Sequence, residues 1–176
     1  GPEHVFASGG NRAGKTTLGL VWFALQIIRR GGKARRFWLV GPTEEKSYRL
    51  LEKLCRPTPA GNGGTVAPVL PAALIERMPD SHRASDLRTR LFDGTIIDLR
   101  SFNNDPTAGR AKSDPIIAGL VDEAAHLPTD AWMSALRGRC VDFGGRLWLA
   151  STARIGSILK ELVDKIKEWA ALTAED

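Results

Sequence analysis

Short apolar runs and longer amphipathic stretches follow one another along the chain, and this order predicts a mixed α/β domain. Apolar runs bounded by glycine, proline or polar residues predict strands at residues 5–7, 36–40, 116–121 and 146–150. Helical spacing of apolar residues predicts helices over residues 14–30, 44–56, 72–78, 130–136 and 157–172. Strands that alternate with helices favour a mostly parallel sheet flanked by helices.

Residue type refines several of these elements. Thr43 is expected to cap the second helix, and Asp93-Gly94 predicts the tight turn of a hairpin over residues 90–102, because glycine tolerates positive φ angles. Prolines and glycines predict a loop over residues 57–71. The apolar residues at helical spacing in the first helix, which are expected to face the core, are Leu18, Val21, Trp22, Leu25 and Ile28.

The composition is that of one ordinary globular domain. The 176 residues include 25 Lys+Arg and 20 Asp+Glu, and 43% are hydrophobic, which excludes wholesale disorder. No apolar stretch approaches the length of a membrane span. Cys55 and Cys140 lie far apart without metal-ligand spacing, so a reducing compartment is expected. Gly1-Pro2 resembles a protease-cleavage remnant, which leaves residues 3–176 as the predicted domain.

A phosphate-binding loop is the most specific motif. It has the Walker A pattern Gly-x-x-x-x-Gly-Lys-Thr, between a predicted strand and a predicted helix. In this context backbone N–H groups and the helix N-terminus converge on phosphates, Lys15 reaches the β- and γ-phosphates, and Thr16 offers its hydroxyl to Mg²⁺. The residues expected to contact the nucleotide are Gly9, Gly10, Asn11, Arg12, Ala13, Gly14, Lys15, Thr16 and Thr17.

Two acids end the apolar strand at residues 116–121 and match a Walker B motif. Asp122 is expected at the carboxyl edge of the sheet, where it would hold Mg²⁺. Glu123 would polarise the water that attacks the γ-phosphate, which favours a hydrolase over a kinase. The long interval between Lys15 and Asp122 leaves room for an extra strand between the two motif strands, as in the additional-strand branch of P-loop ATPases.

A third motif strand, at residues 146–150, is followed by Ser151 and Thr152. Their hydroxyls would lie beside the γ-phosphate and sense its presence. A polar turn that caps a following helix explains the same residues almost as well.

Together these segments resemble the ATPase domain of the large terminase subunit, the DNA-packaging motor of tailed bacteriophages. The matching pieces are the phosphate loop at residues 9–16 with an arginine inside it, the hairpin at 90–102, the loop at 105–109, the segment at 120–125 and the segment at 149–152. The resemblance implies a RecA-like, additional-strand P-loop fold that binds ATP and Mg²⁺.

The resemblance also implies a biological setting. Members of the family form rings on the viral portal, cooperate with a small terminase subunit, and use ATP hydrolysis to move double-stranded DNA into a procapsid in the cytoplasm of the bacterial host. Arg12 corresponds to an arginine that contacts the γ-phosphate, and Ser151 with Thr152 to the motif that couples hydrolysis to movement.

Three departures from the family pattern accompany the resemblance. Few residues precede the phosphate loop, and no nuclease domain follows. Ala108 stands where some members carry an arginine that reaches into the neighbouring subunit, so Arg110 is the nearest substitute, with Arg137 and Arg139 as further candidates.

Two other interpretations stay open. One is half of a helicase-type DNA translocase, and the other is a nucleotide-binding module that assembles rings with little turnover. A cluster of basic residues at the end of the first helix admits DNA contact, although arginines that neutralise the helix C-terminus are the favoured explanation. The cluster comprises Arg29, Arg30, Lys33, Arg35 and Arg36.

Overall fold

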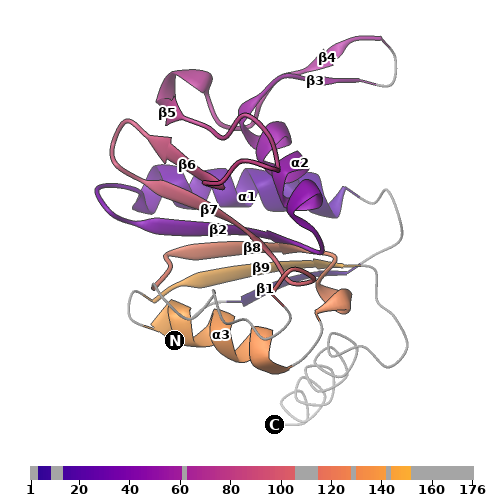
Figure 1. The fold of residues 1–176 in the computed structure, drawn as a ribbon, viewed down its shortest axis with the longest axis vertical. Coiled ribbons are helices and arrows are strands. Elements are labelled where there is room, and N and C mark those ends of the chain that lie inside the picture. Colours follow the sequence, from indigo (N-terminus) through magenta and orange to yellow (C-terminus); the bar gives the residue numbers. More distant parts are fainter. Residues whose placement is uncertain are drawn as a thin grey trace, which may run out of the picture.

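A seven-stranded sheet forms the centre of the protein (Figure 1), with the strand order β1-β9-β8-β2-β7-β6-β5. The structure is a computed structural model and describes residues 4–8, 14–60, 63–105, 115–127, 130–141 and 144–151. The strands of this sheet are β1 His4–Ser8, β2 Arg36–Gly41, β5 Ile75–Arg77, β6 Arg88–Leu91, β7 Ile96–Ser101, β8 Ala118–Asp122 and β9 Arg146–Ser151. The predicted mixed α/β fold with a mostly parallel sheet is confirmed.

Strand direction divides the sheet. The five strands from β1 to β7 in the spatial order are parallel, whereas β6 pairs antiparallel with both β7 and β5. The predicted hairpin is confirmed as β6 and β7, joined by a turn in which Gly94 has φ 85°. An additional strand does lie between the two motif strands β1 and β8, but it is β9. That strand follows β8 in the chain, so the residues between the two motifs do not supply it.

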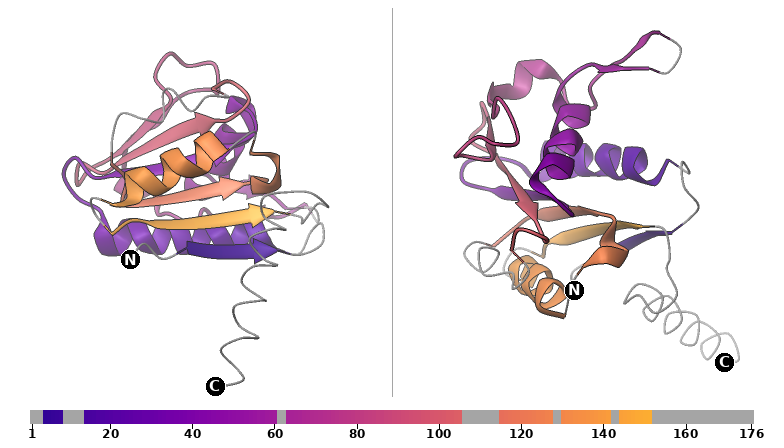
Figure 2. Two further views of the ribbon diagram at one scale, coloured as in Figure 1. Left: turned by 90° about the horizontal axis from the view of Figure 1, so that it is seen from below. Right: turned by 45° about the vertical axis from the view of Figure 1, so that its right-hand side comes forward.

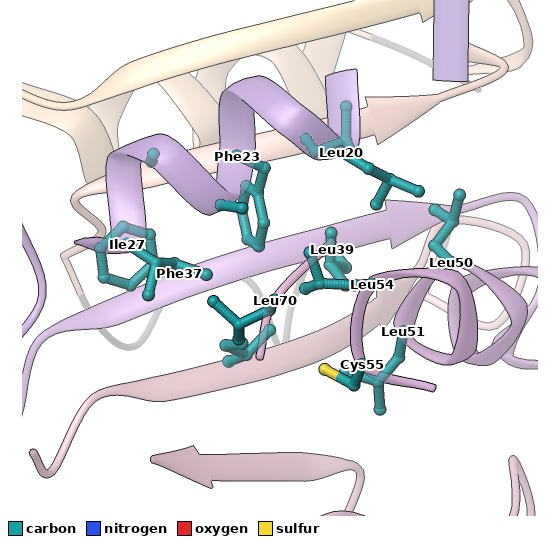
Figure 3. Packing of buried hydrophobic residues seen from close by; sticks show 14 of the residues in the cluster. Leu20, Phe23, Ile27, Phe37, Leu39, Leu50, Leu51, Leu54, Cys55 and Leu70 are labelled. Atoms are coloured by element: carbon teal, nitrogen blue, oxygen red, sulfur yellow. The ribbon is translucent and has the colours of Figure 1, made fainter. Parts of the chain in front are cut away.

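Helices α1 (Lys15–Arg30) and α2 (Glu44–Cys55) pack on one face of the sheet. Figure 3 shows Leu20 and Phe23 of α1 against β2, and Leu51 of α2 belongs to the same apolar cluster. The predicted core face of α1 is wrong by about a third of a turn. Leu20, Phe23, Ala24 and Ile27 are buried, Trp22 is partly buried, and the exposed residues are Leu18, Val21, Leu25 and Ile28.

The opposite face of the sheet carries helix α3 (Asp130–Val141), which is longer than the predicted 130–136. Its Trp132 and Leu136 are fully buried against β2, β8 and β9 in a second apolar cluster. Figure 2 shows α3 and α1 on opposite sides of the sheet. The parallel strands β2, β8 and β9 are therefore buried on both faces, which explains their uninterrupted apolar sequences.

Two segments near the edges differ from expectation. The helix predicted at 72–78 is one 3₁₀ turn, η1 (Ala72–Leu74), that leads directly into the edge strand β5. The predicted loop at 57–71 contains the two-stranded hairpin of β3 (Thr58–Pro59) and β4 (Thr65–Val66). The helix predicted at 157–172 lies outside the described residues. No helix among those described is long and apolar enough to cross a bilayer.

Candidate functional site

The carboxyl ends of β1, β8 and β9 meet at one edge of the sheet, beside the N-terminus of α1. Gly14 caps this helix with φ 73°, a conformation that disfavours any residue with a side chain. No acid lies in the first turn of α1, so its N-terminus can attract an anion. Residues 9–13 lie outside the described residues, whereas Lys15 and Thr16 begin the helix.

Thr16 and Asp122 come together although they are far apart in the sequence. The hydroxyl of Thr16 donates a hydrogen bond to Oδ1 of Asp122 over 3.0 Å. Burial raises the pKa of Asp122 above its ordinary value, and the hydrogen bond from Thr16 offsets this only in part. A partly buried carboxylate at the end of a strand is thus held against the first turn of the phosphate-loop helix.

The oxygen atoms of Thr16 and Asp122 fit a magnesium ion. Mg²⁺ prefers oxygen ligands and in nucleotide enzymes takes only one or two from the protein, the others being water and phosphate. Among the described residues no group of three or more His, Cys, Asp and Glu side chains could enclose a metal. The donor set therefore fits an ion that arrives with a phosphate better than a permanently enclosed one.

Glu123 adopts the left-handed backbone conformation, with φ 53°, directly after β8. Its carboxylate accepts two hydrogen bonds from Nζ of Lys46, over 2.8 and 2.9 Å. Both side chains are partly exposed, so the ion pair lies on the surface of the site rather than in the core. Lys46 was not expected from the sequence, because its position in α2 carries no motif.

Hydrogen bonds anchor the first turn of α2 and so fix the backbone position of Lys46. The hydroxyl of Thr43 accepts a hydrogen bond from the backbone N–H of Lys46, which confirms the predicted cap. Ser47 is fully buried and its hydroxyl donates to the carbonyl of Arg100 in β7 over 2.6 Å. A Cβ at Gly41 would lie only 2.9 Å from that hydroxyl, so glycine lets the helix approach β2.

Ser151 joins the end of β9 to the segment after Glu123. Its hydroxyl accepts a hydrogen bond from the backbone N–H of Ala125 over 3.0 Å. This bond links the predicted coupling residue to the 3₁₀ turn η3 (Ala124–His126), which begins just after the two acids. Thr152 lies outside the described residues.

The other predicted site residues are either outside the described residues or away from the Thr16–Asp122 contact. Arg12 and Arg110 lie outside the described residues, so their predicted roles stay predictions. Thr17 lies on the exposed surface of α1, and Arg137 on the exposed surface of α3. The carbonyl of Arg139 accepts a hydrogen bond from Ile116, which ties α3 to the sheet.

The basic cluster after α1 has structural partners, as the favoured explanation requires. Arg30 donates to the carbonyl of Gly144, and Arg35 donates to the carbonyl of Arg30 at the helix C-terminus. Arg36 forms an ion pair with Asp98 of β7 over 3.0 Å. These contacts account for three of the five basic residues without a ligand.

The order of the parallel strands, with the first helix beginning at their carboxyl edge, is that of the P-loop NTPase fold. Among solved structures it matches the large terminase of a thermophilic bacteriophage, with a TM-score of 0.59, 18% identity, and coverage of 85% of this chain and 34% of that one. A structure of that terminase in complex with ADP matches with a TM-score of 0.57 and 17% identity, over 85% of this chain and 33% of that one. The large terminase ATPase domain of Thermus phage P74-26 matches with a TM-score of 0.50 and 17% identity, over 86% of this chain and 60% of that one.

The chain therefore shares the fold of the ATPase domains of phage large terminases, and it spans about a third of the first of these proteins. The likeness at this level of identity concerns the fold alone. No protein-family model and no curated protein sequence matches the chain.

Proposed function

We propose that this chain is the ATP-hydrolysing domain of a DNA-packaging motor of the large terminase type. The observation that carries the proposal is the contact between Thr16 and Asp122, which joins the phosphate-loop helix to the strand bearing both acids. The large terminases that share the fold include structures with ADP and with ATP-gamma-S, which supports a nucleotide as the ligand.

The nucleotide phosphates would lie at the N-terminus of α1. There the side chain of Lys15 would neutralise the β- and γ-phosphates, and the residues of the loop at 9–14 would supply backbone N–H donors. Thr16 and Asp122 would hold Mg²⁺, which supplies charge neutralisation between the phosphates when it is bound. The hydrogen bond from the hydroxyl of Thr16 to Asp122 supports this assignment, because it keeps the two proposed ligands side by side.

Glu123 would orient the attacking water and accept its proton. Its carboxylate accepts two hydrogen bonds from Lys46, which supports a base that is oriented before the substrate binds. A positioned base contributes about 10²–10⁴-fold to a hydrolytic rate. Through its hydrogen bond with Ala125, Ser151 would transmit a change in the conformation of the segment after Glu123 to β9.

The motor role extends the proposal to partners. It places the domain in a ring of identical chains on a viral portal, with a small terminase subunit, double-stranded DNA as cargo and the procapsid in the bacterial cytoplasm as its location. Arg12 would act on the γ-phosphate within its own subunit, and Arg110 on that of a neighbour. A trans-acting arginine is worth about 10³–10⁵ in rate in other P-loop enzymes, so an isolated chain is expected to be slow.

The deciding test compares the parent chain with Lys15→Ala and, as a matched control, Lys33→Ala. Lys33 is an exposed lysine beyond the other end of α1. Lys15→Ala should abolish binding of a fluorescent ATP analogue and release of phosphate, since neutral backbone donors cannot replace a cation at the phosphates. Lys33→Ala should leave both unchanged. Equal activity of Lys15→Ala and the parent chain would refute the proposed function.

A further inference from the structure

Arginines gather on one face of the sheet, on the half that lies away from β1. The strand register places Arg36 of β2, Arg88 and Arg90 of β6, and Arg100 of β7 on the same face, and Arg77 of β5 lies opposite Arg90. We call these five residues the arginine face. The only acid at the same register positions is Asp98, which is buried between Arg36 and Arg88 at 3.0 and 3.2 Å.

No described helix covers the outer part of the arginine face. In Figure 1 helix α3 lies beside β9 and β1, whereas β5, β6 and β7 are at the other side of the sheet. Along β6 the residues alternate between exposed and buried, so that Arg88 and Arg90 point to solvent while Thr89 and Leu91 enter the core. The arginines are thus presented on the open face of a strand pair.

Three features indicate that the arginine face carries more positive charge than its acids neutralise. Within the part of the chain that the structure describes, Arg77, Arg90 and Arg100 have no ion-pair partner. Arg77 and Arg90 face each other across the strands, and like charges in this position destabilise a sheet. The guanidinium of Arg100 lies over the ring of Trp38, 5.3 Å from its centroid, and its Nε is buried without a hydrogen bond.

The arginine face ends in a hollow at the carboxyl end of β7. This cavity, of about 340 Å³, lies among the segment at 82–88, the end of β7, the start of α2 and Trp132. Arg83, Arg88 and Arg100 line it, together with the acids Glu44, Asp86, Asp98 and Asp105. Because these acids balance Arg83, Arg88 and Arg100 in the cavity, the excess of positive charge lies on the strands at Arg77 and Arg90.

We propose that the arginine face binds the phosphate backbone of double-stranded DNA. Planar guanidinium groups suit phosphate oxygens, and repeated arginines on a rigid strand pair can neutralise successive phosphates without reading sequence. The proposal rests on the proposed function for the identity of the polyanion. It assigns the DNA to the outer strands of the sheet, apart from the edge that would hold ATP.

The test measures binding of a short fluorescein-labelled duplex of mixed sequence to the full chain, by fluorescence anisotropy over a series of KCl concentrations. The double variant Arg77→Gln, Arg90→Gln should bind about tenfold more weakly, and the slope of log affinity against log salt should fall by about 2, or about 1 per lost phosphate contact. These two arginines are chosen because neither forms an ion pair within the described residues, whereas Arg36 and Arg88 hold Asp98.

Two matched variants distinguish a site from bulk charge. Arg29→Gln with Lys33→Gln removes the same charge from the exposed end of α1 and should leave the slope unchanged. Arg77→Lys with Arg90→Lys keeps the charge that neutralises the phosphates and should retain most of the affinity, because this term does not depend on the guanidinium shape. Equal weakening by the α1 variant, or no weakening by the strand variant, would overturn the proposal. Displacement of the duplex by poly-glutamate at equal charge would also overturn it, since the face would then accept any polyanion.

The same proteins separate this proposal from the proposed function. A fluorescent ATP analogue should bind the Arg77→Gln, Arg90→Gln variant as tightly as it binds the parent chain. Loss of DNA binding with retained nucleotide binding supports the arginine face as a distinct site. A parent chain that binds DNA through these arginines but binds no nucleotide would refute the ATPase assignment alone, and one that binds nucleotide but no DNA would refute the arginine face alone.

Discussion

The two halves of the central sheet differ in burial and in charge. Strands β2, β8 and β9 have apolar residues on both faces, because α1 and α2 cover one side and α3 the other. Strand β6 alternates strictly between exposed and buried residues, and its exposed residues are arginines. Parallel pairing occupies the first half and antiparallel pairing the second. The comparison therefore separates a buried scaffold from a solvent-facing surface within one sheet.

This division explains where chemistry can occur. A parallel array directs the carboxyl ends of its strands to one edge, so Asp122, Glu123 and Ser151 meet there beside the N-terminus of α1. An antiparallel pair with one open face cannot form such an edge, but it presents side chains at regular intervals. The parallel half therefore suits a small anionic ligand at its carboxyl edge, and the antiparallel half suits a long anionic partner that lies along its open face.

After Lys15, the side chain with the largest expected effect on turnover is Glu123. Glu123→Gln keeps the shape of the side chain but removes the proposed base, so phosphate release should fall at least about a hundredfold. Binding of an ATP analogue with Mg²⁺ should persist, because Thr16 and Asp122 are unchanged. Single-turnover and equilibrium binding measurements check this. Affinity lost together with turnover would place Glu123 on the metal instead.

Substitutions in the two halves of the sheet should differ in how much they lower the free energy of unfolding. Leu120 of β8 is fully buried between the helices and the sheet, so Leu120→Ala should lower the free energy of unfolding by about 2–5 kcal/mol. Arg90→Ala in β6 should change it by no more than about 0.5 kcal/mol. Urea unfolding of both variants measures the difference. Similar losses at the two positions would mean that the outer strands contribute to the core as much as β8 does.

Much of this arrangement is predictable from sequence where a signal is local. The helix after the phosphate loop, the Thr43 cap and the Asp93-Gly94 turn each depend on neighbouring residues, and each is confirmed. The apolar strand that ends in Asp122 is confirmed for the same reason, because a doubly buried strand has an uninterrupted apolar sequence.

Long-range contacts and side-chain exposure could not be predicted in this way. Because the exposed face of α1 is as apolar as its buried face, the periodicity of apolar residues wrongly predicts that Leu18 and Ile28 face the core. The pairing of Lys46 with Glu123 joins α2 to β8 across the sheet, and it depends on how far α2 approaches β2 at Gly41. Such contacts follow from tertiary geometry and leave no trace in local composition.

Lys46 should have a smaller effect than Glu123 itself. Because its ion pair is partly exposed, its worth is at most about 1 kcal/mol, so Lys46→Met should reduce kcat by no more than about fivefold and leave KM unchanged. The matched control is Arg49→Met, which removes another exposed cation of α2 that pairs with Glu45 within the helix. Steady-state kinetics of both variants checks this. A rise in kcat on Lys46→Met would mean that the pair restrains the base.

The last expected effect is a difference of sign, and it compares one aspartate from each half. Burial raises the pKa of Asp122, so the native state holds the carboxyl proton more tightly than the unfolded chain does. The ionised carboxylate therefore lowers the stability of the native state once the pH is above this raised pKa. Asp122→Asn removes the charge, so without nucleotide the variant should unfold at a higher urea concentration than the parent chain at pH 7. The advantage should shrink as the pH falls toward the ordinary pKa of an aspartate, because the parent carboxyl is then neutral as well.

Asp98→Asn should change stability with the opposite sign at pH 7. Asp98 is buried between Arg36 and Arg88, and its loss leaves two guanidinium groups without their shared partner. Urea midpoints at both pH values decide the matter, and the same sign for both aspartates would remove the electrostatic distinction between the halves.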